Sequence, residues 1–131
     1  MGVQRTTIDE LLAQAREGLV RVEPREALDA MGDGALLIDI RTESQRAADG
    51  RVPEAVWFTR NVLEWRCDPS CEAYDERVGD LERRVIVMCD AGYQSSLAAA
   101  TLQQLGFARA TDLVGGFQAW RAAGLPVAPA A

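Results

Sequence analysis

One cysteine stands where a nucleophile would be useful, at the end of an apolar run and just before a predicted helix. The stretch from Val85 to Gly106 is VIVMCDAGYQSSLAAATLQQLG, so Cys89 begins a short loop of small and polar residues. The chain has no histidine, and all of its basic residues are arginine. These absences exclude Cys-His and Ser-His pairs and lysine Schiff-base chemistry. Activation of Cys89 must therefore come from the loop backbone or from arginine.

The loop backbone can stabilise a thiolate without help from a side chain. If residues 89–96 curl, their N–H groups point toward the sulfur, and Gly92 provides the backbone freedom that a tight curl needs. The helix that follows adds a partial positive charge at its first turn. Amides and helix dipole together form a nest for an anion. The alternative is an inert buried cysteine, which is common because cysteine packs as a small hydrophobic side chain.

Strand and helix patterns alternate along the chain and must position this loop. Short apolar runs predict strands at residues 19–22, 35–40, 55–58, 85–88 and 111–114. Helices are predicted to start at a Thr7–Glu10 capping box, at Pro24, at Asn61, at Ser95 or Ser96, and after the Gly115-Gly116 turn. This order predicts a three-layer α/β/α fold, with a central, mainly parallel sheet of about five short strands.

The chain length predicts one domain with a single core. We expect residues 1–18 to form an N-terminal helix packed on the domain and residues 19–127 to form the domain itself. The alanine-rich residues 128–131 are expected to fray. The sequence shows no long exposed apolar stripe, so we expect a monomer or a weak homodimer.

The net charge of −6 and the pI near 4.6 disfavour nucleic acid and anionic membranes as partners. The N-terminus has no apolar leader, and no apolar run is long enough to span a bilayer. We therefore expect a cytoplasmic protein that needs no cofactor and no metal. Cys67 and Cys71 lie four residues apart with no further metal ligand apparent. A disulfide between them, or attack by one of them on an oxidised Cys89, remains an alternative.

Three predicted strands end in residues that could share one pocket with Cys89. In an open parallel sheet, sites lie outside the carboxyl ends of the strands. Those ends carry Asp39-Ile40-Arg41, Thr59-Arg60-Asn61 and the loop after Met88. The pocket is therefore expected between these three segments.

Individual side chains near these strand ends have competing interpretations. Arg60 is either a pocket cation or a solvated surface charge, and Arg41 is expected to form a structural ion pair, with Glu43 as a candidate partner. Asp39 is expected to bind loop backbone rather than to act as an acid. Tyr93 and Trp65 are candidate pocket walls, and the alternative for Trp65 is ordinary packing on a helix face.

The cysteine loop, Cys89 to Ser95, resembles the active-site loop of the rhodanese-like sulfurtransferase family, whose usual pattern is C-x-x-G-x-R-[ST]. Other family motifs follow in the expected order. They are Asp39-Ile40-Arg41 at a strand end, a G-x-[VI]-P-x-A segment at Gly50 to Ala55, and Leu113-Val114-Gly115-Gly116-Phe117 followed by Trp120. The resemblance extends from about Leu19 to Val127.

The resemblance implies a rhodanese-like fold and a sulfurtransferase of the single-domain thiosulfate type. Cys89 would take a sulfane sulfur from thiosulfate, polysulfide or a partner's persulfide and pass it to a nucleophilic acceptor. The amides of Asp90, Ala91, Gly92, Tyr93, Gln94 and Ser95 would bind the anion, with Arg60 nearby and with Asp39, Arg41 and Trp65 in support. The loop from Cys89 to Gln94 has six residues, the sulfur-transfer length in this family.

The chain departs from the family pattern at three positions. Gln94 replaces the loop arginine and so lacks a bidentate anion contact. Asp90 places a carboxylate beside the nucleophile, and Arg51 replaces a common histidine whose position is usually structural. The first two changes favour a less anionic donor or weak catalysis. The alternatives are therefore a catalytically weak binding or sulfur-carrier module and, less favoured, a related cysteine phosphatase or arsenate reductase.

Overall fold

The computed structural model describes residue 2 and residues 4–130. Its elements are α1 (Ile8–Glu17), α2 (Pro24–Gly32), β1 (Leu36–Asp39), α3 (Glu43–Asp49), β2 (Val56–Trp57), the 3-10 turn η1 (Arg60–Val62), α4 (Leu63–Cys67), the 3-10 turn η2 (Glu76–Val78), β3 (Val85–Met88), α5 (Gln94–Gln104), β4 (Ala110–Asp112) and α6 (Gly116–Ala122). Over these residues, no helix is both long and apolar enough to cross a membrane.

The sheet has four parallel strands in the order β2-β1-β3-β4. Its two central strands, β1 and β3, are buried along their whole length. Helices cover both faces of these strands, which explains why β3 is a continuous apolar run and why β1 is apolar up to its last residue, Asp39. The predicted α/β fold with a parallel sheet is therefore confirmed.

The prediction of a fifth strand at residues 19–22 is wrong. Only Val22 pairs with the sheet, through one isolated parallel bridge to Leu113. Val20 is exposed, and its carbonyl accepts a hydrogen bond from the Thr111 hydroxyl rather than from a backbone amide. Pairing cannot continue past Val22, because Pro24 has no N–H and already begins α2.

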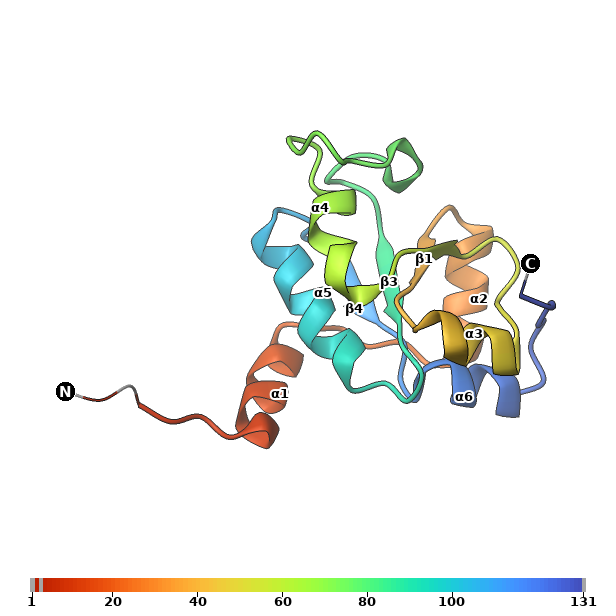
Figure 1. Cartoon of the computed structure of the whole chain (residues 1–131), viewed down its shortest axis with the longest axis horizontal. Helices are drawn as coiled ribbons and strands as arrows, with labels where there is room; N and C mark the ends of the chain where they lie inside the picture. The colour runs from red at the N-terminus through yellow and green to blue at the C-terminus, as the bar shows by residue number, and fades with distance from the viewer. Residues whose placement is uncertain (1, 3, 131) are drawn as a thin grey trace.

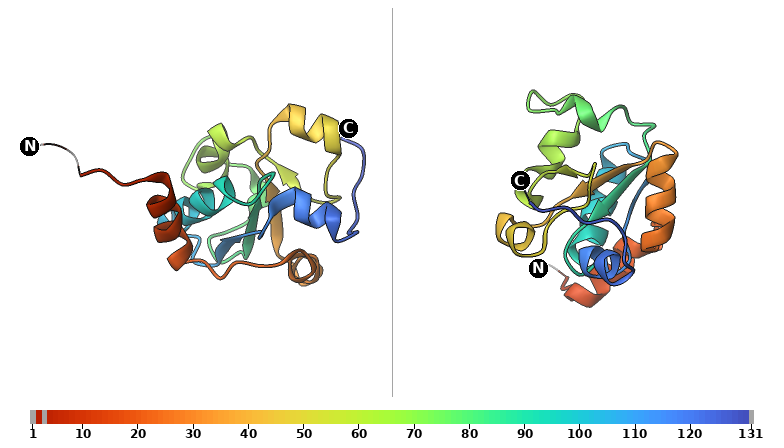
Figure 2. Two further views of the ribbon diagram at one scale, coloured as in Figure 1. Left: turned by 90° about the horizontal axis from the view of Figure 1, so that it is seen from below. Right: turned by 90° about the vertical axis from the view of Figure 1, so that its right-hand side faces the viewer.

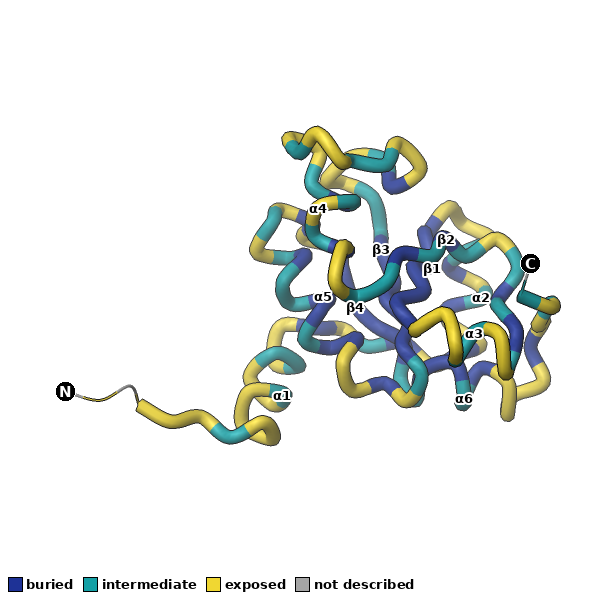
Figure 3. Tube along the Cα trace, in the orientation of Figure 1, coloured by how far each residue is buried: buried dark blue, intermediate teal, exposed yellow. Residues whose placement is uncertain are grey.

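Helices cover both faces of the sheet and complete three layers, as Figures 1 and 2 show. On one face, α4 and α5 pack against Ile38 and Val87, which point the same way from β1 and β3. On the other face, α2 and α6 pack against Leu37 and Ile86. The buried trace at the centre of Figure 3 is this sheet, and the exposed residues lie on the surrounding helices and loops.

Helix α1 lies outside the three layers, against α5 (Figure 1). The predicted capping box between Thr7 and Glu10 is present, and Gly18 ends the helix. None of the residues in α1 is fully buried. The side-chain amide of Gln103 on α5 donates to the carbonyl of Gly18 at 3.0 Å, so a specific contact fixes the end of the helix to the domain.

The structure contains one helix that the sequence did not predict, and another helix that begins earlier than predicted. Helix α3 was not predicted, because its seven residues include no buried side chain and therefore carry no apolar pattern. The capping box between Thr42 and Gln45 was its available signal. Helix α5 begins at Gln94, ahead of Ser95 and Ser96, because both serine hydroxyls donate to a buried carboxylate instead of capping the helix.

The beginning of the expected frayed tail is ordered. Ala128 forms an antiparallel bridge with Arg51, and its N–H and C=O groups both bond to Arg51 at 2.8 Å. The prediction that fraying starts at residue 128 is therefore wrong. Composition could not reveal this pairing, because it depends on a backbone partner far away in the sequence.

Candidate active site

Cys89 directly follows β3 and lies at the start of a curled loop. Its Sγ accepts hydrogen bonds from the backbone N–H groups of Gly92, at 3.1 Å, and Ser95, at 3.4 Å. The cysteine is 6% exposed and lines a surface pocket. Two of the amides predicted to face the sulfur therefore do so, and their hydrogen bonds favour a negatively charged sulfur.

Contacts outside the loop hold its carbonyl groups outward. Cys89 O accepts from the N–H of Phe117 at 2.9 Å, and Asp90 O accepts from the N–H of Gln118 at 3.1 Å. None of the described peptide bonds is cis, and a trans peptide directs its N–H opposite to its C=O. The N–H groups of Asp90 and Ala91 are therefore directed to the inner side of the loop.

Close packing against the Gly115-Gly116 turn fixes the shape of the loop. Gly92 has φ +87°, and a Cβ added there would lie 2.6 Å from Gly115 N. A Cβ on Gly116, whose φ is +60°, would lie 2.4 Å from Cys89 O. The two backbones can meet this closely only because neither residue has a side chain. This contact is the structural reason for the paired glycines before α6.

The pocket in front of Cys89 has a volume of about 600 Å³ and an open mouth. The loops after β1, β2 and β3 all line it, which confirms the predicted convergence of three strand ends. Its lining residues are Ile40, Arg41, Thr42, Glu43, Gln45, Thr59, Arg60, Asn61, Cys89, Asp90, Ala91, Tyr93 and Gln94. The pocket is therefore open to a small molecule or to a protruding group of a partner.

Arg60 lies in this pocket lining, but its charge is engaged. Its Nη1 lies 2.8 and 2.9 Å from the two carboxylate oxygens of Glu64, one helical turn away. Both side chains are about a quarter exposed. Since Glu43 and Asp90 also line the pocket, Arg60 does not make it an electropositive site.

Arg41 forms a structural ion pair, as predicted, but its partner is Asp39 rather than Glu43. Arg41 Nη2 lies 2.8 Å from Asp39 Oδ2, and both side chains are at most 1% exposed. Arg41 also donates to Gly50 O and stacks on the Phe117 ring, 3.8 Å from its centroid. Asp39 accepts the backbone N–H of Arg41 as well, so it binds loop backbone as predicted.

Trp65 does not wall the pocket, and that prediction is wrong. It is 59% exposed and instead lines a separate shallow hollow that includes Cys71 and Leu105. In α4, Leu63 and Cys67 are the buried residues. Trp65 lies halfway between these two positions and therefore on the other side of the helix. Tyr93, by contrast, does line the Cys89 pocket.

Asp90 is held by a side chain from α6. The amide nitrogen of Gln118 donates to Asp90 Oδ1 and to Asp49 Oδ2, at 3.0 Å in each case. Gln118 therefore ties the cysteine loop to the end of α3. This contact fixes the carboxylate whose position next to Cys89 is a departure from the family pattern.

Cys67 and Cys71 do not line the Cys89 pocket, and all three cysteines are free thiols. Cys67 is fully buried on α4, while Cys71 is partly exposed. Burial raises the pKa of the Cys67 thiol to about 12, and the nearby carboxylates of Glu64 and Asp75 act in the same direction. Cys67 is therefore protonated and poorly reactive in the folded protein at neutral pH.

Cys67 should resist alkylation in the native protein. We expect iodoacetamide at about pH 8 to modify Cys71 while Cys67 stays free, since only the thiolate reacts. Peptide mapping by mass spectrometry distinguishes the two sites, and the same treatment in denaturant should label both. Equal labelling of Cys67 and Cys71 under native conditions would contradict the burial argument.

The same pKa difference predicts a loss of stability at alkaline pH. The unfolded chain releases the Cys67 proton near the usual value of 9.0, whereas the folded chain keeps it until about 12. The unfolded state therefore binds fewer protons in this window, and the free energy of unfolding falls as pH rises through it. Urea titrations should show a smaller decline in Cys67→Ala than in the wild-type protein.

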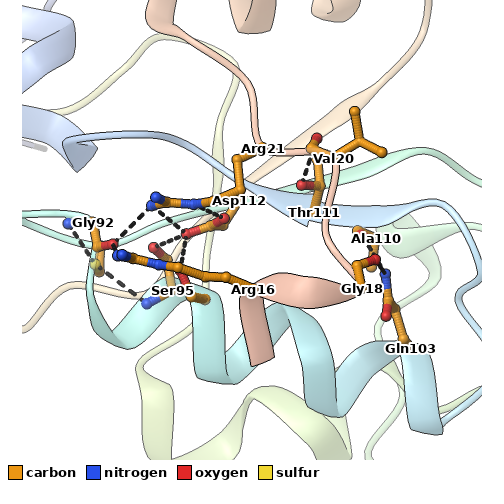
Figure 4. A network of polar contacts seen from close by, with 12 residues as sticks. Arg16, Gly18, Val20, Arg21, Gly92, Ser95, Gln103, Ala110, Thr111 and Asp112 are labelled. Atoms are coloured by element: carbon orange, nitrogen blue, oxygen red, sulfur yellow. Dashed lines mark hydrogen bonds and ion pairs between the residues drawn. The ribbon is translucent and has the colours of Figure 1, made fainter. Parts of the chain in front are cut away.

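Three residues that support the loop were missed by the sequence analysis (Figure 4). Asp112, at the end of β4, is fully buried and accepts the hydroxyls of Ser95 and Ser96 at 2.7 and 2.8 Å. Arg21 donates to both oxygens of Asp112, and both Arg16 and Arg21 donate to Gly92 O. No local pattern indicates this cluster, because Arg16 and Arg21 lie about 70 to 90 residues away from the Gly92 and Asp112 groups that they bind.

Comparisons with known proteins agree with this architecture. Residues 23–123 match the rhodanese-like domain family. A sulfurtransferase from Allochromatium vinosum is 32% identical over 95 residues, which cover 72% of this chain and 79% of that protein. The thiosulfate sulfurtransferase GlpE of Pseudomonas entomophila is 32% identical over 101 residues, covering 77% of this chain and 84% of the relative.

Solved structures give the same result. A Rhodopseudomonas palustris protein, described as of unknown function and as a possible tyrosine phosphatase, superimposes with a TM-score of 0.85 at 28% identity. The match covers 97% of this chain and 100% of that one. The polysulfide-sulfur transferase homodimer from Wolinella succinogenes gives a TM-score of 0.71 at 25% identity, covering 92% and 85%. With the cysteine loop at the carboxyl end of a parallel sheet, and with a family match over most of its length, the chain belongs to the rhodanese-like domain family.

Proposed function

We propose that the chain is a sulfurtransferase that carries a sulfane sulfur on Cys89. The Cys89 thiolate attacks the outer sulfur of a donor, the sulfur–sulfur bond of the donor breaks, and the leaving group departs with the electron pair. Polysulfide then leaves as a chain shorter by one sulfur, and thiosulfate leaves as sulfite. A nucleophilic acceptor takes the sulfur from the Cys89 persulfide and regenerates the thiolate, so the cycle needs no redox cofactor.

The hydrogen bonds from Gly92 and Ser95 to Sγ carry this proposal. Donors placed around a sulfur stabilise its anion, and they also suit the terminal sulfur of a persulfide, which is itself an anion. The pocket supports the same assignment, because it opens directly onto Cys89 and is large enough for a donor.

The charges around the pocket favour a donor with little negative charge. Glu43 and Asp90 line the pocket, and its two arginines, Arg41 and Arg60, are paired with Asp39 and Glu64. Gln94 has no charge with which to replace the arginine of the family pattern. We therefore propose that a protein persulfide, which carries one negative charge, or a polysulfide, whose two charges lie at opposite ends of the sulfur chain, is a better donor than the compact dianion thiosulfate. The names of the relatives include both a thiosulfate and a polysulfide sulfurtransferase.

Phosphatase activity is the second candidate, because the Rhodopseudomonas palustris neighbour is described as a possible tyrosine phosphatase. A phosphoryl group carries charge on several oxygens and is best held by a bidentate arginine. Gln94 occupies the position where the family pattern has that arginine, and the pocket has two carboxylates. These features favour sulfur transfer over phosphate-ester hydrolysis.

The proposal is tested by weighing the intact protein after exposure to thiosulfate and, separately, to polysulfide. We expect a gain of one sulfur atom, larger in extent with polysulfide, and release of thiocyanate when cyanide is added. Absence of any mass gain with both donors would refute sulfur carriage and leave a binding module. Hydrolysis of an aryl phosphate without sulfur uptake would instead establish the phosphatase.

A further inference from the structure

The carbonyl of Gly92 is bound by two arginines (Figure 4). Arg16 Nη2 and Arg21 Nη2 each donate to Gly92 O at 2.9 Å. Arg16 lies on α1 and Arg21 in the segment that follows it. Both precede residues 23–123, the part of the chain that matches the family.

We infer that Arg16 and Arg21 are positioning residues of the cysteine loop, supplying from behind it the positive charge that Gln94 lacks. The inference rests on the proposed function only for the identity of the anion that the loop binds. The Gly92–Tyr93 peptide is trans, so its N–H is directed opposite to the carbonyl that the arginines hold. The Tyr93 N–H is thereby directed toward the inner side of the loop.

Two charge-assisted hydrogen bonds to one carbonyl also polarise the peptide that contains it. A polarised peptide carries more positive charge on its N–H and donates more strongly. Tyr93 N–H thus becomes a better donor to an anion in the loop. The arginines act on the anion through the peptide and do not enter the pocket, whose lining contains neither of them.

The charges in this cluster leave a net positive charge behind the loop. Asp112 is fully buried and forms an ion pair with Arg21 at 2.9 Å. Among the residues that the structure describes, no carboxylate forms an ion pair with Arg16; its Nε donates to Ser96 Oγ at 3.0 Å, and its guanidinium lies 5.8 Å from the centre of the Tyr93 ring. Two guanidiniums and one carboxylate therefore leave one unit of positive charge next to Gly92.

Other contacts hold the N-terminal segment without touching the loop. Thr111 Oγ1 donates to Val20 O at 2.8 Å, and Gln103 Nε2 bridges Gly18 O and Ala110 O at 3.0 Å each. Simple attachment of α1 is therefore separable from polarisation of the loop. Thr111→Val and Gln103→Ala loosen the attachment and leave the Gly92 carbonyl contacts in place.

The test compares Arg16→Met, Arg16→Lys and Thr111→Val with the wild-type protein. Arg16→Met should lower the rate of Cys89 alkylation by neutral iodoacetamide about fivefold at neutral pH. This size suits the loss of one charged hydrogen bond that acts on the sulfur indirectly, through the Gly92–Tyr93 peptide. The same variant should also move the Tyr93 amide ¹⁵N resonance upfield. Arg16→Lys should restore most of the alkylation rate, and Thr111→Val should change neither reading.

Steady-state kinetics give a third reading. Arg16→Met should lower kcat for sulfur transfer and leave KM nearly unchanged, because the stabilised charge lies on the enzyme's own sulfur. Arg21→Lys serves as the second variant, since removing Arg21 outright would leave Asp112 buried without its cation. In Arg21→Lys, the Tyr93 amide ¹⁵N resonance should move in the same direction as in Arg16→Met, by a smaller amount.

Two outcomes would overturn the inference. One is a Tyr93 amide and an alkylation rate that stay at wild-type values in Arg16→Met. The other is an equal loss of alkylation rate in Thr111→Val, which would show that the arginines only attach the N-terminal segment to the domain. Alkylation and the amide resonance need no sulfur donor, so they remain decisive even if the protein proves not to transfer sulfur. Failure here would equally leave the sulfurtransferase proposal standing.

Discussion

Replacing Cys89 with serine is expected to abolish both the gain of sulfur and the release of thiocyanate, down to the uncatalysed background. Serine keeps an acceptor atom for the N–H groups of Gly92 and Ser95, so the loop should retain its shape. Its oxygen cannot carry a sulfane sulfur as a persulfide. The change therefore removes the proposed nucleophile and little else.

Cys71→Ala is the matched control for this experiment. Cys71 is partly exposed, and it lies outside the pocket that Cys89 lines. We expect normal sulfur uptake and normal thiocyanate release in this variant, measured by intact mass and by thiocyanate assay. Sulfur uptake that persists in Cys89→Ser and disappears in Cys71→Ala would show that Cys71, and not Cys89, carries the sulfur.

Replacing Gly92 with alanine should lower the rate of sulfur transfer about 100-fold, as expected when a donor to the reacting anion is lost. The new Cβ would lie 2.6 Å from Gly115 N, and the residue would have to keep φ at +87°. The loop must shift to relieve this contact. Its N–H then leaves the position from which it donates to Cys89 Sγ at 3.1 Å.

Gly34→Ala separates backbone strain from loop geometry. Gly34 has φ +101°, and a Cβ there meets nothing within 4 Å. Both variants should lose about 1–3 kcal/mol of stability from the left-handed backbone alone. Only Gly92→Ala should lose activity, measured as the thiocyanate rate on protein shown to be folded by circular dichroism. A Gly92→Ala enzyme with wild-type rates would show that the Gly92 N–H does not act on the sulfur.

The cysteine loop owes its shape to contacts outside it. Its outward carbonyls are held by the first turn of α6 and by two arginines near the N-terminus. Its serines are held by Asp112 from β4. The inner side is consequently left with N–H groups. The chain has no histidine or lysine, so the groups next to the loop that can stabilise an anion are peptide N–H groups and the nearby Arg16 and Arg21. Neither of these two arginines lines the pocket.

The amino-acid sequence alone determined the fold class and predicted Cys89 as the candidate nucleophile. Continuous apolar runs such as Val85–Met88 show strands covered on both faces, and their alternation with helices indicates a parallel sheet. The places of Cys89 and Gly92 in the loop could be predicted, because a tight turn between a strand and a helix needs a flexible residue within a few positions of the strand end. The three strand ends converged as predicted, since strands that run parallel bring their carboxyl ends to one edge.

Only the tertiary structure decided which charges act on the loop and which side chains face the pocket. Arg41 pairs with Asp39, Arg60 with Glu64, and Arg21 with Asp112. Trp65 faces away from the pocket because burial of Leu63 and Cys67 sets the rotation of α4. Charge pairing and helix rotation depend on neighbours brought together by folding, whereas strand periodicity and loop chemistry are properties of adjacent residues.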